Sequence, residues 1–190
     1  MRNGEQIDAA LKTGELHSVV FGMGCFWGPD SRIGALDGVV QTRVGYAGGT
    51  STTPEYRNLE GHAEVVRVIF DETLPFPELF SVFSQWFRPA KVGRIGRGSQ
   101  YRPAIFANDA QLSVVESFLA SFDEDARPQV GSLDEWSFWD AEAYHQKYRL
   151  RTSSPRLVAA LQAEFGERWD ESTLATKCNG LESTSWRLAS

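Results

Sequence analysis

Apolar residues recur along the chain at two spacings, and each spacing predicts one type of element. Continuous or alternating apolar runs predict strands over residues 19–23, 39–46, 62–70, 101–106 and 135–139. Apolar residues three or four positions apart predict helices that begin near Pro29, Pro77, Leu112 and Pro155. Because strands and helices are intermixed without a sequence repeat, the pattern favours an α+β two-layer sandwich with helices packed on a mixed β-sheet.

The two ends of the chain carry weaker patterns. Residues 1–17 are polar and are predicted to form an N-terminal arm, in which Ile7 and Leu11 could anchor one helical turn. Residues 167–190 lack clear periodicity and are predicted to form a C-terminal tail. The length of 190 residues and the 42 % hydrophobic content fit one folded unit, so we expect a single domain over residues 1–190.

Charge and apolar run length exclude several classes of partner. A formal net charge of −6 gives no electrostatic reason to bind nucleic acid or an anionic membrane. No stretch has the roughly 18 consecutive apolar residues that a membrane helix needs. Residues 1–17 also lack the apolar centre of a signal peptide. We therefore expect a cytoplasmic protein with no nucleic-acid or membrane partner.

Cysteine usage indicates one candidate nucleophile. The two cysteines, Cys25 and Cys178, lie near opposite ends of the chain, which fits neither a disulfide scaffold nor a metal site. Cys25 stands in the segment GCFWG, at the predicted corner between a strand and a helix. The positive end of a helix dipole and nearby amide donors would favour its thiolate. The alternative is that Cys25 is a small buried core residue.

Aromatic residues near this motif allow both a binding and a structural interpretation. Phe26 and Trp27 could form an apolar wall that receives a small uncharged group, or they could belong to the core. Tyr46, Tyr56 and Tyr101 could present hydroxyl groups to a polar substrate oxygen, or they could bond to the protein backbone. Spacing alone does not choose between these interpretations.

Two titratable residues, His62 and Glu64, lie at the start of the predicted strand over residues 62–70. Strand alternation places Glu64 on the same face as Val66 and Val68, where desolvation would raise the pKa of its carboxyl and make it a general acid. The alternative is that Glu64 reaches water at the strand end. His62 could serve as a base for Cys25, or it could have a hydrogen-bonded structural role.

Six segments in a fixed order resemble the A-type peptide methionine sulfoxide reductases. They span approximately residues 19–150 and read GCFWG, VGYAGG, TTPEY, GHAEVVRVIF, GSQYRPAIF and AEAYHQKY. The resemblance implies a two-layer α+β sandwich with a ferredoxin-like core. It also implies an oxidoreductase that reduces methionine (S)-sulfoxide, in proteins or free, and so repairs proteins after oxidative stress.

The resemblance further implies a role for individual residues. Cys25 would attack the sulfoxide sulfur and become a sulfenic acid, while Glu64 would protonate the departing oxygen. Four aromatic residues would bind the substrate, with the methyl group held by Phe26 and Trp27 and the oxygen by Tyr56 and Tyr101. No bound cofactor is implied, because an external thiol reductant such as thioredoxin clears the sulfenic acid. We expect the protein to act as a monomer.

Two places depart from the family pattern. Where members carry His-Asp-Pro after a helix, this chain has Phe87-Arg88-Pro89, and Ile95 and Gly96 replace the Asn-Asp pair before Tyr101 in a slightly shorter loop. The missing aspartate helps to hold the oxygen or a water in the family pocket. Arg94 or Arg97 could replace this donor, or could lie in a solvated loop. An alternative is therefore a divergent member that binds or reduces a different sulfoxide-like ligand, with weak or no methionine sulfoxide reductase activity.

Recycling of the cysteine has two open routes. Cys178 is the candidate resolving cysteine if its segment folds back within disulfide range of Cys25. If Cys178 is buried, an external thiol has to resolve Cys25 directly. A hypothesis from another enzyme class is a cysteine hydrolase that uses Cys25 and His62 for acyl transfer.

Overall fold

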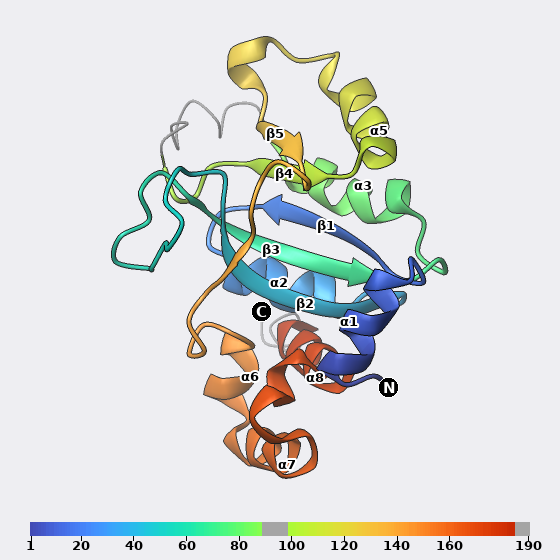
Figure 1. Cartoon of the computed structure of the whole chain (residues 1–190), viewed down its shortest axis with the longest axis vertical. Coiled ribbons are helices and arrows are strands. Elements are labelled where there is room, and N and C mark those ends of the chain that lie inside the picture. Colours follow the sequence, from blue (N-terminus) through green and yellow to red (C-terminus); the bar gives the residue numbers. More distant parts are fainter. Residues whose placement is uncertain (89–98, 185–190) are drawn as a thin grey trace.

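The protein is built around a mixed six-stranded β-sheet (Figure 1). The computed structural model describes residues 1–88 and 99–184. The described strands are β1 (His17–Gly22), β2 (Val39–Ala47), β3 (Ala63–Phe70), β4 (Ala104–Ala107), β5 (Gln129–Ser132) and β6 (Trp139–Asp140). The described helices are α1 (Gly4–Lys12), α2 (Trp27–Gly34), α3 (Phe76–Trp86), α5 (Asp109–Leu119), α6 (Tyr148–Ser153), α7 (Pro155–Phe165) and α8 (Thr173–Thr184), with 3-10 turns η1 (Glu124–Ala126) and η2 (Gly166–Glu171).

The four central strands have a ferredoxin-like connection. Their order along the chain is β1-α2-β2-β3-α3-β4, and their order in the sheet is β4-β1-β3-β2 with every neighbouring pair antiparallel. At the two edges, β5 pairs with β4 in parallel and β6 pairs with β2. The predicted α+β class, with helices on a mixed sheet, is confirmed. Within the part of the chain that the structure describes, no helix is long and apolar enough to cross a membrane.

The largest apolar core lies between one face of the sheet and the helices α2, α3 and α5. Its buried residues include Val19, Phe21, Ile33, Val66, Val68, Leu79, Phe83, Val115 and Leu119. On the opposite face, α1 packs on one part of the sheet and residues 133–138 pack on another. Because both faces are covered, β2 is buried along its whole length.

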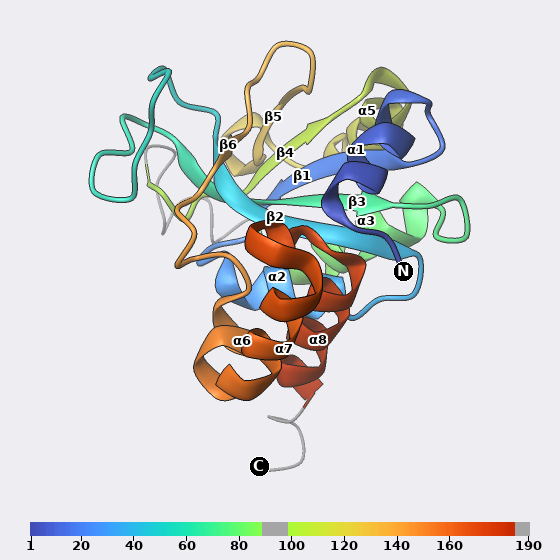
Figure 2. The same cartoon turned by 60° about the horizontal axis from the view of Figure 1, so that its bottom comes forward.

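The two ends of the chain are more ordered than their patterns predicted. Residues 4–12 form α1, which is longer than the one turn expected, and Ile7 and Leu11 anchor it as predicted. Asn3 caps this helix in a reciprocal capping box. Residues 173–184 form α8, which packs on α2 (Figure 2). At this contact, Gly180 lies against Ala35. A side chain at Gly180 would clash there, since its Cβ would lie 2.7 Å from the Ala35 Cα.

The outer strands also differ from expectation. Of the segment over residues 135–139, only Trp139 belongs to a strand, the two-residue β6, and β5 was not predicted. The sequence of β5, Gln-Val-Gly-Ser, has little apolar alternation, and its position depends on parallel pairing with β4.

A buried polar cluster around one ion pair joins α2, β2, α8 and the residue that precedes α6. The Lys147 ammonium is fully buried and lies 3.1 Å from an Asp30 carboxylate oxygen. It also donates to the Thr42 carbonyl and lies 3.0 Å from the Thr42 hydroxyl. The Asn179 side-chain amide donates to the other Asp30 oxygen at 2.9 Å. This polar cluster therefore fixes the helix that follows Cys25 against the C-terminal helices.

Removing the cation of this cluster is expected to destabilise the fold strongly. Lys147→Met would leave the Asp30 carboxylate in the interior without its cation, so the free energy of unfolding should fall by about 3–5 kcal/mol. Urea unfolding measures the change. Arg168→Gln is the control, because the exposed pairs of Arg168 with Asp8 and Glu171 should contribute less than about 1 kcal/mol. Equal losses in both variants would contradict the importance of the buried pair.

Candidate active site

Cys25 lies at the corner between β1 and α2, as the sequence predicted. The strand ends at Gly22, and Gly24 then turns the chain with a φ of +84°, a conformation that favours glycine. The next residue, Cys25, has an exposed side chain, and α2 begins at Trp27. The alternative of a buried core cysteine is therefore wrong.

The acidity of the Cys25 thiol differs from the prediction. Partial burial raises the pKa of Cys25 above its ordinary value, and the charge of ionised Glu64 raises it further. A hydrogen bond from the Trp27 backbone and the charge of Arg149 act in the opposite direction but do not outweigh desolvation. The predicted amide donor at the helix start is therefore present and favours the thiolate, but desolvation outweighs it in the protein without substrate. A neutral Glu64 would make the thiolate easier to form.

Glu64 is the buried acid next to this cysteine. It is 1 % exposed and lies on the face of β3 that also carries Val66, so the predicted alternation is confirmed and the solvent-facing alternative is wrong. Its Oε2 accepts from the Phe26 backbone N–H at 3.1 Å, and its Oε1 accepts from the Gln100 side-chain amide at 3.1 Å. Burial raises the pKa of Glu64 to about 7, although both hydrogen bonds act to lower it. The carboxyl can therefore hold or release a proton near neutral pH.

The two aromatic residues that follow Cys25 differ in their surroundings. Phe26 is 1 % exposed and belongs to an apolar cluster with Val44, Tyr46 and Ala141, which supports the core alternative for this residue. Trp27 is partly buried and stacks on Tyr148 with ring centroids 3.8 Å apart and an interplanar angle of 8°. The Trp27 indole N–H donates to His145 Nδ1 at 3.2 Å, and the His145 ring lies edge-on to Phe26 at 5.1 Å. The orientation of Trp27 is thus fixed by two residues of the segment around α6. Neither His145 nor Tyr148 was predicted to have a role, although both belong to the segment AEAYHQKY.

The three candidate tyrosines fall into different environments. Tyr46 is fully buried and its hydroxyl donates to Glu142 at 2.8 Å, which supports a structural role. The ring of Tyr56 lies 4.8 Å from His145, and its backbone N–H donates to the other Glu142 oxygen at 3.0 Å. Tyr101 is 37 % exposed, and partial burial together with the charge of Glu64 raises its pKa. Tyr56 and Tyr101 are therefore the two tyrosines available to a ligand at Cys25.

Cys178 lies outside this site. It is 9 % exposed in α8 and packs in a separate apolar cluster with Leu150, Leu161 and Trp169. Both cysteines are free thiols. The structure therefore does not show the folded-back tail that a resolving role for Cys178 requires, and this role stays a prediction.

His62 does not act on Cys25 in this structure. Its Nδ1 lies 2.8 Å from the Leu59 carbonyl oxygen, which supports the structural alternative. Among residues 1–88 and 99–184, the interactions that shift the Cys25 pKa involve Trp27, Glu64 and Arg149. The arrangement gives no support to a hydrolase based on Cys25 and His62.

The departures from the family pattern are described only in part. Phe87 is buried in the main core, where its ring stacks on Phe83, so it contributes to packing. Pro89, Arg94, Ile95, Gly96 and Arg97 lie outside the described residues. No group of three or more metal-binding side chains occurs in the described ranges 1–88 and 99–184.

Comparison with known proteins agrees with this site. A profile of the family described as peptide methionine sulfoxide reductase matches residues 17–176. The peptide methionine sulfoxide reductase MsrA of Vibrio cholerae is 39 % identical over 160 residues, which cover 77 % of this chain and 75 % of the relative. Peptide methionine sulfoxide reductase A5 of Arabidopsis thaliana is 37 % identical over 174 residues, 87 % of this chain and 67 % of the relative.

A solved structure gives the same result. Methionine sulfoxide reductase A of Corynebacterium diphtheriae matches with a TM-score of 0.60 at 28 % identity, covering 73 % of this chain and 76 % of that chain. The family profile spans most of the chain, including the cysteine motif, β3 and the segment around α6. This chain therefore belongs to the peptide methionine sulfoxide reductase family.

Proposed function

We propose that this enzyme reduces methionine sulfoxide with Cys25 as the nucleophile and Glu64 as the proton donor. The observation that carries the proposal is the placement of an exposed thiol beside a buried carboxyl whose pKa is about 7. Such a carboxyl can be protonated at neutral pH while a substrate is bound. Membership of the family supports methionine sulfoxide reduction and protein repair, and it does not favour the alternative of a ligand-binding or weakly active member.

The proposed reaction transfers the sulfoxide oxygen to Cys25. The Cys25 sulfur attacks the sulfoxide sulfur, whose oxygen takes a proton from Glu64. The attack forms an S–S bond, and the S–O bond of the substrate breaks. The released hydroxyl then adds to the Cys25 sulfur as the S–S bond breaks, which gives Cys–S–OH and methionine. The thiol proton balances the reaction, so methionine sulfoxide and Cys–SH give methionine and Cys–SOH. The substrate sulfur is reduced by the two electrons that the Cys25 sulfur loses.

The surroundings of Cys25 support selectivity for one sulfoxide epimer. The sulfoxide sulfur carries an oxygen, a methyl group, the rest of the methionine and a lone pair. We place the oxygen near Glu64, Tyr56 and Tyr101, and the methyl group against Phe26 and Trp27. Because the direction of attack by Cys25 is also fixed, only one configuration at sulfur directs the rest of the methionine toward solvent. We assign this configuration to the S epimer, as the family resemblance implies.

Turnover of the separate epimers tests the proposed function. Purified methionine (S)- and (R)-sulfoxides are each incubated with dithiothreitol or with a thioredoxin system, and methionine is quantified by chromatography. We expect consumption of the S epimer alone. Consumption of the R epimer alone would contradict the placement of the substituents, and no turnover with either reductant would contradict the proposed substrate.

We propose that the sulfenic acid at Cys25 is resolved by a thiol from outside the chain. This route is supported by the exposure of Cys25 and the burial of Cys178 in α8. The external thiol would condense with Cys25 to a mixed disulfide and release water, and a second thiol would then regenerate Cys25. Thioredoxin as this donor, a monomeric state and a cytoplasmic location stay predictions.

Replacing the second cysteine is therefore expected to leave recycling intact. Cys178→Ser should keep the turnover number within about twofold of the wild type with either dithiothreitol or the thioredoxin system, because an external thiol would then act on Cys25 and Cys178 packs in a separate cluster. Steady-state methionine production checks this. If the variant turned over normally with dithiothreitol but not with thioredoxin, Cys178 would be the resolving cysteine. The helix α8 would then have to leave its packed position so that Cys178 could reach Cys25.

A further inference from the structure

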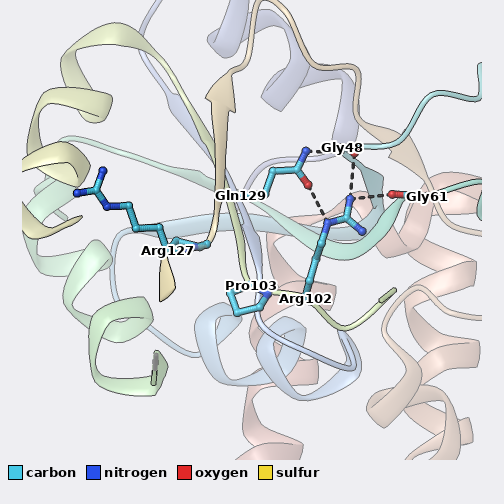
Figure 3. A pocket seen from close by; sticks show the side chains of 7 residues that line it. Gly48, Gly61, Arg102, Pro103, Arg127 and Gln129 are labelled. Atoms are coloured by element: carbon cyan, nitrogen blue, oxygen red, sulfur yellow. Dashed lines mark hydrogen bonds between the residues drawn. The ribbon is translucent and has the colours of Figure 1, made fainter. Parts of the chain in front are cut away.

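Arg102 is a buried cation that directly follows Tyr101 in the chain. It is 5 % exposed and lines a cavity of about 260 Å³ together with Gly48, Gly61 and Gln129 (Figure 3). No ion pair joins it to a carboxylate among the residues that the structure describes, and burial lowers its pKa. Burying an unpaired guanidinium costs free energy unless hydrogen bonds compensate it. Its position therefore requires an explanation.

The guanidinium is held by oxygen acceptors from four separate parts of the chain. Its Nη2 donates to the Gly48 carbonyl at 3.0 Å and to the Gly61 carbonyl at 2.8 Å. Its Nε donates to Gln129 Oε1 at 2.8 Å, and its Nη1 donates to the Ser99 carbonyl at 3.1 Å. Figure 3 shows the side chain extending from the segment before β4 toward Gly48 and Gly61. Arg102 thus connects the end of the β2–β3 ladder, at the pair Ala47–Ala63, with the start of the β4–β5 ladder, at the pair Ala104–Gln129.

Each connected segment adjoins a group of the candidate active site. Gly48 and Gly61 bracket the loop that contains Tyr56, and Gly61 lies three residues before Glu64. Ser99 immediately precedes Gln100, whose side chain donates to the Glu64 carboxylate. The Gln100 carbonyl in turn accepts from the Glu64 backbone N–H at 2.7 Å. The four hydrogen bonds of Arg102 therefore hold Glu64, Tyr56 and Tyr101 in one arrangement.

We propose that Arg102 is a positioning residue for the groups that hold and protonate the sulfoxide oxygen. The inference rests on the function proposed above. Arg102 does not touch the substrate in this proposal, and it acts through Gln100, Tyr101 and the loop that carries Tyr56. Displacements of about 1 Å in groups that orient a reaction can reduce its rate about 100-fold. Loss of Arg102 should therefore slow the reduction step.

The effect on Glu64 gives a readout that simple destabilisation would not. The hydrogen bond from Gln100 lowers the pKa of Glu64. When Arg102 no longer fixes the segment, that hydrogen bond weakens and the pKa of Glu64 rises above about 7. The apparent pKa near neutrality in the pH profile of the reduction step should move to higher pH.

The experiment measures methionine formed in a single turnover without reductant, as a function of pH, for Arg102→Met and Arg102→Lys. Arg102→Met should be about 10–100-fold slower, with the apparent pKa shifted upward. Arg102→Lys should be intermediate, because one ammonium cannot reach all four acceptors. Arg127→Met is the matched control, since Arg127 lines the same cavity but points away from Arg102 and donates to the Phe122 carbonyl at 3.0 Å (Figure 3).

The outcomes separate this inference from the proposed function. If the wild type forms no methionine, the proposed function fails and this inference fails with it. If the wild type is active and folded Arg102→Met keeps the same rate and pH profile, the positioning role alone is overturned. Circular dichroism reports folding. Should Arg102→Met not fold, an unchanged rate and pH profile in Arg102→Lys would overturn the role, whereas a slower rate with a shifted pKa would support it.

Discussion

Cys25→Ser is expected to remove methionine production from the S epimer below detection. A serine hydroxyl ionises far less readily than a thiol and is a poor nucleophile toward sulfur. It also cannot take the oxygen in a form that thiols reduce. Because the Cys25 side chain is exposed, the substitution should leave the free energy of unfolding nearly unchanged. The loss of activity would therefore report on chemistry and not on folding.

The measurement is chromatographic quantification of methionine with dithiothreitol as reductant, alongside a urea unfolding curve. Cys178→Ser is the matched control, because it makes the same chemical change at the buried cysteine of α8. Turnover in Cys25→Ser within tenfold of the wild type would exclude Cys25 as the nucleophile. A loss of turnover in both variants with intact folding would mean that Cys178 also takes part.

Glu64→Gln is expected to slow the reduction step by about 10²–10⁴-fold, the usual contribution of a positioned general acid. Glutamine can still accept from the Phe26 backbone N–H but has no acidic proton to donate to the sulfoxide oxygen. Single-turnover methionine formation measures this effect. Glu116→Gln serves as the control, since Glu116 is an exposed residue of α5. A rate within threefold of the wild type would show that Glu64 is not the proton donor.

The same variant should make the free Cys25 more reactive. Ionised Glu64 raises the pKa of the Cys25 thiol, so removing this negative charge should lower that pKa. The pH dependence of alkylation by iodoacetamide measures the shift, and its midpoint should move to lower pH in Glu64→Gln. A variant that loses sulfoxide reduction while gaining thiol reactivity would distinguish loss of the acid from damage to the nucleophile.

The sequence predicts the centre of this fold better than its ends. In β3, alternation placed Glu64 correctly on the core face, because a strand covered on both sides leaves little freedom of register. In α8, buried positions include the polar Thr176 and Asn179, because the helix packs against α2, α6 and η2 on several sides. A helix of this kind has no single apolar face, so periodicity did not reveal it.

The site residues show the same division. The cysteine corner was visible in GCFWG, because a strand, a glycine and a helix start follow each other in sequence. The raised pKa of Cys25 was not visible, since it depends on burial in the fold and on the charge of Glu64, which lies on β3. Arg102 gives no pattern of its own in sequence, because its four acceptors come from segments up to 54 positions away.

The substrate sulfoxide is expected to oxidise Cys25 to a sulfenic acid. The most direct measurement is a single turnover of the S epimer without reductant, with dimedone present to label sulfenic acid and mass spectrometry to locate the label. We predict about one methionine formed per enzyme molecule and a label on Cys25, in the wild type and in Cys178→Ser alike. Absence of methionine, or methionine formed without oxidation of Cys25, would contradict the account.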